Sequence, residues 1–285
     1  MIMEIIVAKS AGFCFGVDRA VKSVYDNISN KPLYTYGPII HNLQVVNELE
    51  DKGVKVVNNI EELRKLEKGK VIIRSHGVEE KIYEIIKDSG FSIVDATCPY
   101  VKKIHHIVND YSKKGDTIII IGDSTHPEVI GIKGWSTRET IIIENVEDAK
   151  KLDIPKDTHL CVVAQTTLNY LKYQEIIEII LDKGYHVDIK NTICRATRDR
   201  QEEAINLSKK VDKMLVIGGK HSSNTRKLYQ LCKNQCDNTY HIETIEDLEL
   251  LVFSKNEIIG ITAGASTPKN IIQEVITHVR NTERN

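Results

Sequence analysis

Three short stretches of this sequence repeat one pattern: Gly12-Phe13-Cys14-Phe15-Gly16-Val17, Asp95-Ala96-Thr97-Cys98-Pro99-Tyr100 and Asn191-Thr192-Ile193-Cys194-Arg195-Ala196-Thr197. Each follows a run rich in apolar residues that is typical of a β-strand, and each leads into the apolar spacing of a helix. The pattern predicts three strand-to-helix turns with one cysteine each, and hence three similar lobes. Three thiolates that converge on one point would form an iron–sulfur site with one ligand missing.

The composition is that of a soluble globular protein with room for two or three domains. The chain has 285 residues, 41% hydrophobic and 28% charged, and a net charge of −1. Such a balance gives no basic field for nucleic acid or an anionic membrane. No apolar run approaches the roughly 18 residues of a membrane span, and the N-terminus resembles a strand rather than a signal peptide. We therefore expect a cytoplasmic protein with neither nucleic acid nor membrane as partner.

Strand-like runs alternate with amphipathic helical runs along the chain, which predicts an α/β fold with mainly parallel sheets flanked by helices. No Gly- or Pro-rich linker interrupts the alternation. The lobe boundaries are therefore placed at the cysteine turns. We expect lobe 1 at 14–97, lobe 2 at 98–193 and lobe 3 at 194–285, with the N-terminal strand within 1–13 joining lobe 3.

The other cysteines have simpler interpretations. Cys161 lies in an apolar run, where a role in the core is expected. Cys232 and Cys236 are four residues apart on an expected helix, and packing is favoured over metal binding because no third ligand is near. The three cysteines of the turns precede helices, whose positive ends favour thiolate. Spacing alone leaves open that these three are unrelated buried cysteines.

Each lobe also offers two polar loops after strands, where parallel sheets gather their functional groups. The loops lie at 37–42, 74–77, 122–128, 164–167, 218–224 and 262–268. Three of them contain His41, His76 and His126, one in each loop. As hydrogen-bond donors, and as cations when protonated, these histidines would suit a phosphate or diphosphate.

Two further loop features admit a structural and a functional interpretation. Ser222-Ser223-Asn224 precedes an expected helix from Thr225 to Lys233, and is either an ordinary N-cap or an anion site; Ser266 has the same two interpretations. Glu128 follows His126-Pro127. It either complements a helix dipole or, buried beside anions, has a raised pKa and carries a proton. Thr166 could bind that carboxyl group or the substrate.

Taken together, these segments resemble the 4-hydroxy-3-methylbut-2-enyl diphosphate reductase family, whose motifs occur in the same order along essentially the whole chain. The matching segments are 11–17, 40–42, 75–77, 95–99, 125–128, 165–167, 192–197, 222–224 and 262–266. The resemblance implies three lobes around a central [4Fe-4S] cluster with three cysteine ligands and one open iron. The implied ligands are Cys14, Cys98 and Cys194.

The same resemblance implies roles for the loop residues. Glu128 matches the proton donor, and Thr166 and His126 accompany it in the catalytic set. The implied substrate contacts are His41, His76, His126, Thr166, Ser222, Ser223, Asn224 and Ser266. His221 stands where members of the family tend to carry asparagine, which affects only the fine detail of the phosphate site.

The implied reaction is reductive dehydroxylation of a small-molecule diphosphate to isopentenyl and dimethylallyl diphosphate, the last step of the non-mevalonate isoprenoid pathway. Reduced ferredoxin or flavodoxin is the implied electron donor. No G-x-G-x-x-G fingerprint for a nicotinamide cofactor follows any expected strand. Two alternatives are a non-redox [4Fe-4S] hydro-lyase acting on a phosphorylated small molecule and a non-enzymatic iron–sulfur sensor. The polar loops of all three lobes argue against the sensor.

Overall fold

The computed structural model describes residues 3–29, 31–249 and 251–282. Its strands form three separate four-stranded sheets, and every strand pairing is parallel. The strands are β1 (Glu4–Val7), β2 (Leu33–Tyr36), β3 (Val54–Val57), β4 (Lys70–Ile73), β5 (Ser92–Asp95), β6 (Thr117–Ile121), β7 (Thr140–Ile143), β8 (His159–Ala164), β9 (His186–Ile189), β10 (Lys213–Ile217), β11 (Thr239–Ile242) and β12 (Ile258–Ala263).

The three sheets have one topology. Their strand orders are β3-β2-β4-β5, β7-β6-β8-β9 and β11-β10-β12-β1. In each sheet two inner strands are flanked by edge strands, and β1, from the start of the chain, holds the place that β5 and β9 hold in the other sheets. The expected α/β fold of three lobes with parallel sheets is confirmed.

Helices connect the strands. They are α1 (Phe15–Tyr25), α2 (Leu43–Asp51), α3 (Ile60–Arg64), α4 (Glu80–Asp88), α5 (Pro99–Lys114), α6 (Pro127–Lys133), α7 (Val146–Lys151), α8 (Tyr170–Asp182), α9 (Arg195–Ser208), α10 (Ser223–Lys233), the 3-10 helix at Ile245–Leu248 and α11 (Lys269–Thr282). Two boundaries differ from expectation. Helix α10 starts two residues before Thr225, and it ends at Lys233, so Cys236 lies beyond it.

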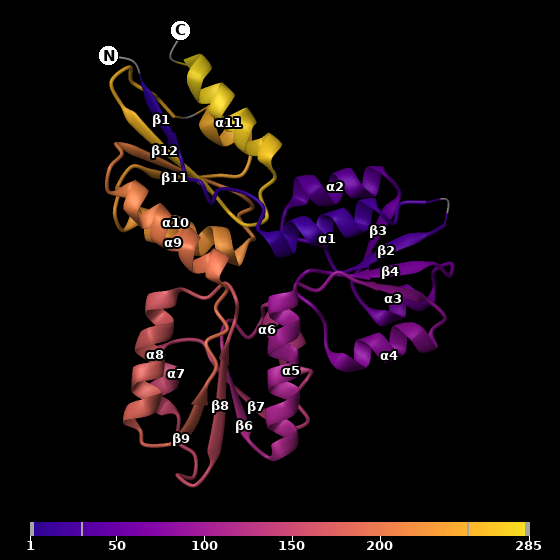
Figure 1. Cartoon of the computed structure of the whole chain (residues 1–285). Helices are drawn as coiled ribbons and strands as arrows, with labels where there is room; N and C mark the ends of the chain where they lie inside the picture. Colours follow the sequence, from indigo (N-terminus) through magenta and orange to yellow (C-terminus); the bar gives the residue numbers. More distant parts are fainter. Residues whose placement is uncertain (1–2, 30, 250, 283–285) are drawn as a thin grey trace. The chain divides into compact units, whose positions relative to one another are not determined.

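The sheet β6–β9 shows why these sequences are apolar without alternation. Ile119 and Ile121 belong to the core on one face with residues of α8, whereas Ile118 and Ile120 belong to the core on the other face with residues of α5. Figure 1 shows α5 and α6 on one side of this sheet and α7 and α8 on the other. All four isoleucines are fully buried because both faces are covered.

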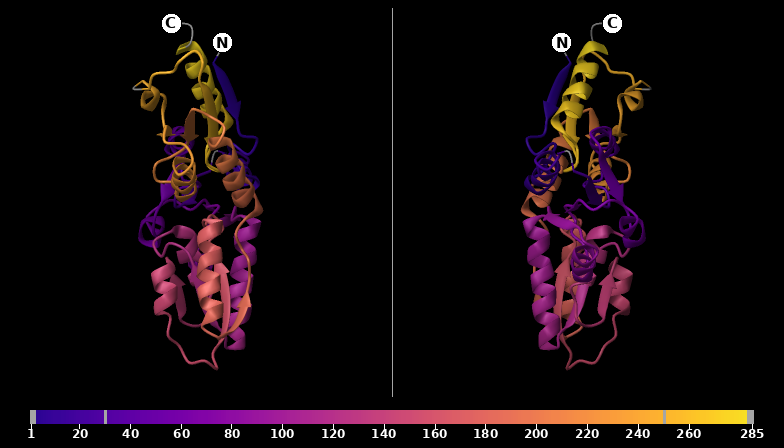
Figure 2. Two further views of the ribbon diagram at one scale, coloured as in Figure 1. Left: turned by 90° about the vertical axis from the view of Figure 1, so that its left-hand side faces the viewer. Right: turned by 90° about the vertical axis from the view of Figure 1, so that its right-hand side faces the viewer.

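Contacts between Cα atoms divide the chain into two compact units. Unit 1 comprises residues 1–18, 41–47 and 195–285, and contains the sheet β1, β10–β12; unit 2 comprises 19–40 and 48–194, and contains the other two sheets. In unit 1 the first strand and the last helix come together, since β1 pairs with β12 and Ile5 packs into a core with α11. Both views of Figure 2 show β1 beside α11.

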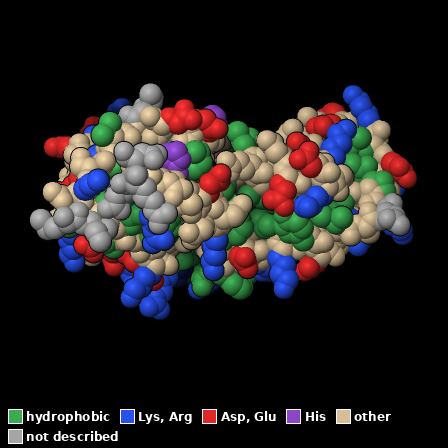
Figure 3. Space-filling view, turned by 90° about the horizontal axis from the view of Figure 1, so that it is seen from above, with side chains coloured by type: hydrophobic (Ala, Val, Ile, Leu, Met, Phe, Trp, Pro, Cys, Tyr) green, Lys and Arg blue, Asp and Glu red, His purple; other side chains and the backbone are tan. Residues whose placement is uncertain are grey.

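The surface carries charges of both signs. On the face drawn in Figure 3, Lys and Arg side chains are interspersed with Asp and Glu side chains. This mixture agrees with the net charge of −1. Among the described residues, no helix combines the length and the apolar character that a bilayer crossing requires.

Candidate active site

The three turn cysteines occupy equivalent places. Cys14, Cys98 and Cys194 each directly precede the first residue of a helix, namely α1, α5 and α9, and each is partly buried. Cys98 is the N-cap residue of α5, with Pro99 at the first helical position. Exposed N–H groups and the positive helix end favour a negative sulfur at such a position.

The main chain holds each of these cysteines in the same way. The N–H of Cys98 donates to Ser75 O (2.9 Å), that of Cys194 to Thr166 O (3.0 Å) and that of Cys14 to Ala265 O (3.3 Å). Each acceptor lies two residues beyond the end of the neighbouring strand, β4, β8 or β12. The repeat therefore extends from the sheets to the individual hydrogen bond that supports each cysteine.

The remaining cysteines have a different environment. Cys161, in the middle of β8, and Cys232, on α10, are completely buried. Burial raises the pKa of Cys161 to about 12 and that of Cys232 to about 11. Because thiolate is the form that binds metal, these two are poor ligands, in agreement with the core role expected for Cys161.

Glu128 is buried on the first turn of α6, with only 2% of its surface exposed. Its Oε1 accepts a hydrogen bond from the Thr166 main-chain N–H (2.6 Å), and its Oε2 accepts one from the Thr166 hydroxyl (2.8 Å). An exposed first-turn glutamate would complement the helix dipole in water; this one is fixed by a loop of the same sheet. The carboxyl group can hold a proton at a defined place, and the Thr166 hydroxyl can donate to it or accept from it.

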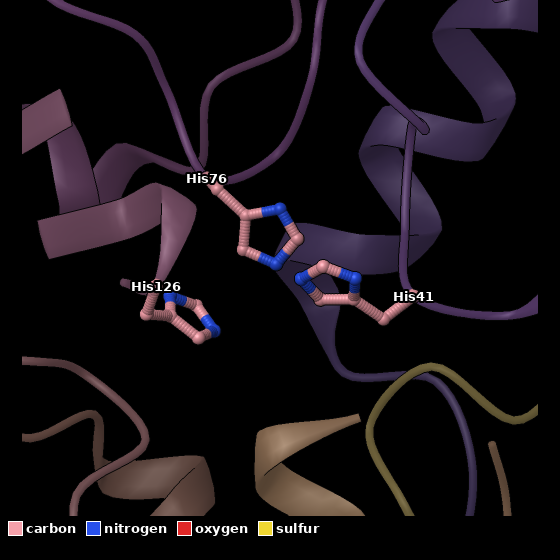
Figure 4. A group of neighbouring side chains, drawn as sticks. All are labelled: His41, His76 and His126. Atoms are coloured by element: carbon pink, nitrogen blue, oxygen red, sulfur yellow. The ribbon is translucent and has the colours of Figure 1, made fainter. Parts of the chain in front are cut away.

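His126 caps the same helix. Its Nδ1 accepts a hydrogen bond from the Glu128 N–H (3.1 Å), so the neutral ring carries its proton on Nε2. The ring of His76, from the loop after β4, packs edge-on against it with 5.5 Å between centroids. Figure 4 shows the two rings together, and it also labels His41, which belongs to unit 1.

Two aromatic side chains, Trp135 and the buried His105, support the turn that contains His76. The indole of Trp135 donates to Val78 O (2.9 Å), two residues after His76, and stacks on the ring of His105 with 4.9 Å between centroids. Gly77 has a φ of 71°, and a Cβ there would lie 2.6 Å from His105 Cε1, so only glycine fits this turn. Sequence reasoning did not single out Trp135, although it is the one tryptophan of the chain.

Unit 1 contributes neutral hydroxyl and amide groups. Ser222 is the N-cap of α10, and its hydroxyl accepts a hydrogen bond from Thr225 N (3.3 Å). Ser223 and Asn224 form the first turn of the helix and are 6% and 8% exposed. The Asn224 side-chain amide nitrogen is buried and has no hydrogen-bond partner among the described residues. A buried donor of this kind at a helix N-terminus is suited to an anionic ligand.

The other site residues of unit 1 are His41 and Ser266. The Ser266 hydroxyl donates to His41 O at 3.1 Å, which joins the loop after β12 to the segment before α2. His221 is exposed next to the Ser222 cap. The structure therefore brings the predicted site residues together in two sets, which are His41, Ser222, Ser223, Asn224 and Ser266 in unit 1 and His76, His126, Glu128 and Thr166 in unit 2.

Comparison with known proteins extends over nearly the whole chain. A protein from Caldanaerobacter subterraneus subsp. tengcongensis named 4-hydroxy-3-methylbut-2-enyl diphosphate reductase is 50% identical over 282 residues, with 98% of this chain and 97% of the relative covered. A protein of the same name from Clostridioides difficile is 48% identical over 281 residues, with 98% and 100% covered.

Solved structures agree with these relatives. The E-1-hydroxy-2-methyl-but-2-enyl-4-diphosphate reductase from Plasmodium falciparum matches with a TM-score of 0.90 and 31% identity, covering 97% of this chain and 88% of that one. A second structure, described as the terminal enzyme of the non-mevalonate pathway, matches with a TM-score of 0.68 and 40% identity, covering 99% and 100%. The LytB protein family matches residues 5–280. The chain therefore belongs to the LytB protein family.

Proposed function

We propose that this protein is an iron–sulfur oxidoreductase that converts 4-hydroxy-3-methylbut-2-enyl diphosphate to isopentenyl and dimethylallyl diphosphate, the terminal step of the non-mevalonate pathway. The full-length similarity to reductases of that name supports the substrate and the reaction. The observation within the structure that best supports the chemistry is the buried Glu128 carboxyl group, held at both oxygens by Thr166.

The reaction balances with two electrons and two protons. The bond between carbon and the hydroxyl oxygen breaks, one proton leaves with that oxygen as water, and the other is added to a carbon of the allyl system. Glu128 would deliver the proton to the departing oxygen, because a buried carboxyl group is the kind of acid that holds a proton until it is needed. Thr166 keeps Glu128 oriented in both protonation states, since its hydroxyl can either donate or accept.

The histidines of unit 2 would bind and orient the substrate beside that acid. In the neutral form His126 presents an Nε2–H donor, because its Nδ1 accepts from the Glu128 main chain. A donor fixed in this way needs little reorganisation when negative charge arrives. His76, whose ring packs on that of His126, would contribute a second imidazole to the same task.

The diphosphate would bind to the unit 1 set. Ser222, Ser223 and Asn224 surround the first turn of an 11-residue helix, where main-chain N–H groups and the helix dipole favour negative charge. The unpartnered amide of Asn224 supplies a buried donor that a phosphate oxygen would satisfy. His41 and Ser266 complete this set.

The turn cysteines fit an iron–sulfur cluster by the chemistry of their environment. Cys14, Cys98 and Cys194 lie at helix starts, where main-chain N–H groups suit a negatively charged ligand, whereas burial raises the pKa of Cys161 and Cys232. We therefore assign the first three as ligands of a [4Fe-4S] cluster with one open iron. When bound, the cluster would supply single electrons and a Lewis acid.

We propose a reduced ferredoxin or flavodoxin as the electron donor, as the resemblance to the reductase family implies. No nicotinamide fingerprint follows the strands of the sequence. We also propose that the protein acts in the cytoplasm, in line with its composition.

An anaerobic assay tests the proposal. The cluster-loaded protein is incubated with 4-hydroxy-3-methylbut-2-enyl diphosphate and a reduced viologen, and both five-carbon diphosphates are quantified. We expect isopentenyl and dimethylallyl diphosphate together with oxidation of two viologens per product. Failure of cluster-loaded protein to form either product would favour the hydro-lyase alternative, which consumes no reductant.

A further inference from the structure

The helices that start at the three cysteines do more than present the thiols. Helix α1 starts after Cys14 and contacts the turn before Cys98. Its Arg19 guanidinium donates from Nη1 to Thr97 O (3.0 Å) and from Nη2 to Asp95 O (3.3 Å). Thr97 is completely buried and directly precedes Cys98. One side chain thus satisfies two carbonyl groups of the turn that carries this cysteine.

Helix α9 starts after Cys194 and makes a similar contact with the turn before Cys14. The Glu203 carboxylate accepts hydrogen bonds from Lys9 N (2.8 Å), Ser10 N (2.9 Å) and the Ser10 hydroxyl (2.5 Å). Partial burial raises the pKa of Glu203, but the hydrogen bonds from Ser10 and Lys9 outweigh this effect, so the pKa is lowered overall. The carboxylate is therefore ionised at neutral pH and keeps all three acceptor contacts.

Helix α5, which starts after Cys98, completes the series with a weaker contact. A hydrogen bond from Tyr111 lowers the pKa of Asp188, and Lys190 Nζ lies 4.9 Å from the centroid of the Tyr111 ring. Both residues precede Cys194. This contact uses half-buried side chains, whereas Arg19 and Glu203 bind the main chain itself, so it constrains the turn less.

We propose that Arg19 and Glu203 are positioning residues for the cysteine turns. Arg19 fixes the main chain that precedes Cys98, and Glu203 fixes the main chain that precedes Cys14. The inference rests on the proposed function, since it assumes that Cys14 and Cys98 bind the cluster. A metal site needs ligands held to within about 0.5 Å, and a loop achieves this only when groups behind the ligands fix it. The two residues differ in charge but act alike, as multidentate partners of main-chain groups.

The test compares four single variants prepared and loaded anaerobically. Arg19→Lys keeps the charge but loses the two-pronged contact, and Glu203→Gln keeps the shape but loses acceptors. The matched controls are Lys22→Met, at an exposed position of α1, and Glu202→Gln, at an exposed position of α9. The measurements are iron and sulfide per chain, the rate at which a ferrous chelator removes iron, and the electron paramagnetic resonance spectrum of the reduced cluster.

We expect roughly 10-fold faster iron loss and an altered resonance spectrum in Arg19→Lys and Glu203→Gln, and wild-type behaviour in both controls. Circular dichroism melting of the cluster-free variants separates this effect from general unfolding. Wild-type iron loss and spectrum in folded Arg19→Lys and Glu203→Gln would overturn the inference.

A Cys98→Ser variant separates the inference from the proposed function. If the wild type binds a cluster that Cys98→Ser lacks, but the Arg19 and Glu203 variants behave as wild type, only the positioning role fails. If the wild type binds no cluster, or Cys98→Ser binds one with unchanged iron content and spectrum, the cluster assignment fails and the positioning role fails with it.

Discussion

The two units support their site residues by different means. In unit 2 the functional groups are ionisable side chains held by other residues: Glu128 by Thr166, and the His76 turn by Trp135. In unit 1 they are mostly neutral hydroxyl and amide groups held by their place at the start of α10. A proton donor must change charge during the reaction, whereas a diphosphate site needs only fixed donors. The difference therefore matches the two tasks that we assign.

Glycines show how the unit 1 site depends on the main chain. Gly218 has a φ of 144°, a conformation that L side chains rarely adopt, and a Cβ there would lie 2.8 Å from Thr225 Oγ1. A Cβ at Gly264 would also collide with Thr225. The first turn of α10 can approach the ends of β10 and β12 only because both positions lack side chains. The unit 1 arrangement thus depends on the close approach of the backbone at these two positions.

The largest expected effect follows from replacing the acid of unit 2. Glu128→Gln keeps the shape of the side chain and can still accept from the Thr166 N–H, but it has no proton to deliver. We expect kcat to fall by about 10²- to 10⁴-fold, with substrate affinity and iron content unchanged. Anaerobic steady-state kinetics and a substrate titration of the cluster-loaded variant measure both quantities.

The control for this variant is Glu139→Gln, an exposed glutamate of the same lobe. Its kcat should equal that of the wild type. A Glu128→Gln enzyme with wild-type kcat would remove Glu128 from the proton-donor role and, with it, the functional contrast between the two units.

The second effect is on the pH dependence of stability in unit 2. Burial lowers the pKa of His105 to about 4, with smaller effects from Asp95, His106 and Lys102. Between pH 6.5 and 4 the unfolded chain binds a proton that the folded chain does not. The free energy of unfolding therefore falls as the pH drops through this window, by up to about 3 kcal/mol.

Trp135 makes the measurement local, because it is the one tryptophan and stacks on His105. Urea unfolding followed by its fluorescence gives the free energy of unfolding at several pH values. We expect this free energy to depend less steeply on pH in His105→Asn than in the wild type. The slope of the free energy of unfolding against pH is compared, and not its absolute value, because the substitution also changes packing. Equal slopes in the two proteins would show that the buried imidazole does not cause this pH dependence of stability.

The third effect concerns the helix start of unit 1. Ser222→Ala removes the cap hydroxyl from α10 and, with it, the contact that we propose to a charged phosphate. We expect KM to rise roughly 10-fold at constant kcat, because hydrogen bonds to charged groups contribute about 1.5–3 kcal/mol and the main-chain donors remain. Asn169→Ala, which removes the N-cap of α8, is the matched control. It should lower stability by about 1 kcal/mol and leave KM unchanged. A drop in kcat in Ser222→Ala would show that unit 1 also contributes to catalysis, which would contradict the division of tasks between the two units.

Much of this arrangement could be predicted from the sequence because local signals and tertiary structure agree. The strand–cysteine–helix turns predicted the repeated lobes, and the polar loops after the strands predicted which side chains face the carboxyl ends. The residues that hold these turns in place could not be predicted. Arg19 and Glu203 lie on helices as ordinary charged residues, and only folding brings them to carbonyl and N–H groups far away in the sequence. A charged side chain carries no local sign of a main-chain partner.

The smallest expected effect distinguishes two serines of unit 1. The hydroxyl of Ser222 accepts a hydrogen bond from Thr225 N, so its own hydrogen would be available for the proposed phosphate oxygen, whereas the hydroxyl of Ser266 donates its hydrogen to His41 O. Ser266 must give up that bond before it can donate to a ligand. Ser266→Ala should therefore raise KM by only about 2- to 5-fold, less than Ser222→Ala, in the same assay. A larger increase than in Ser222→Ala would mean that the bond to His41 itself, by fixing that loop, is what the diphosphate site requires.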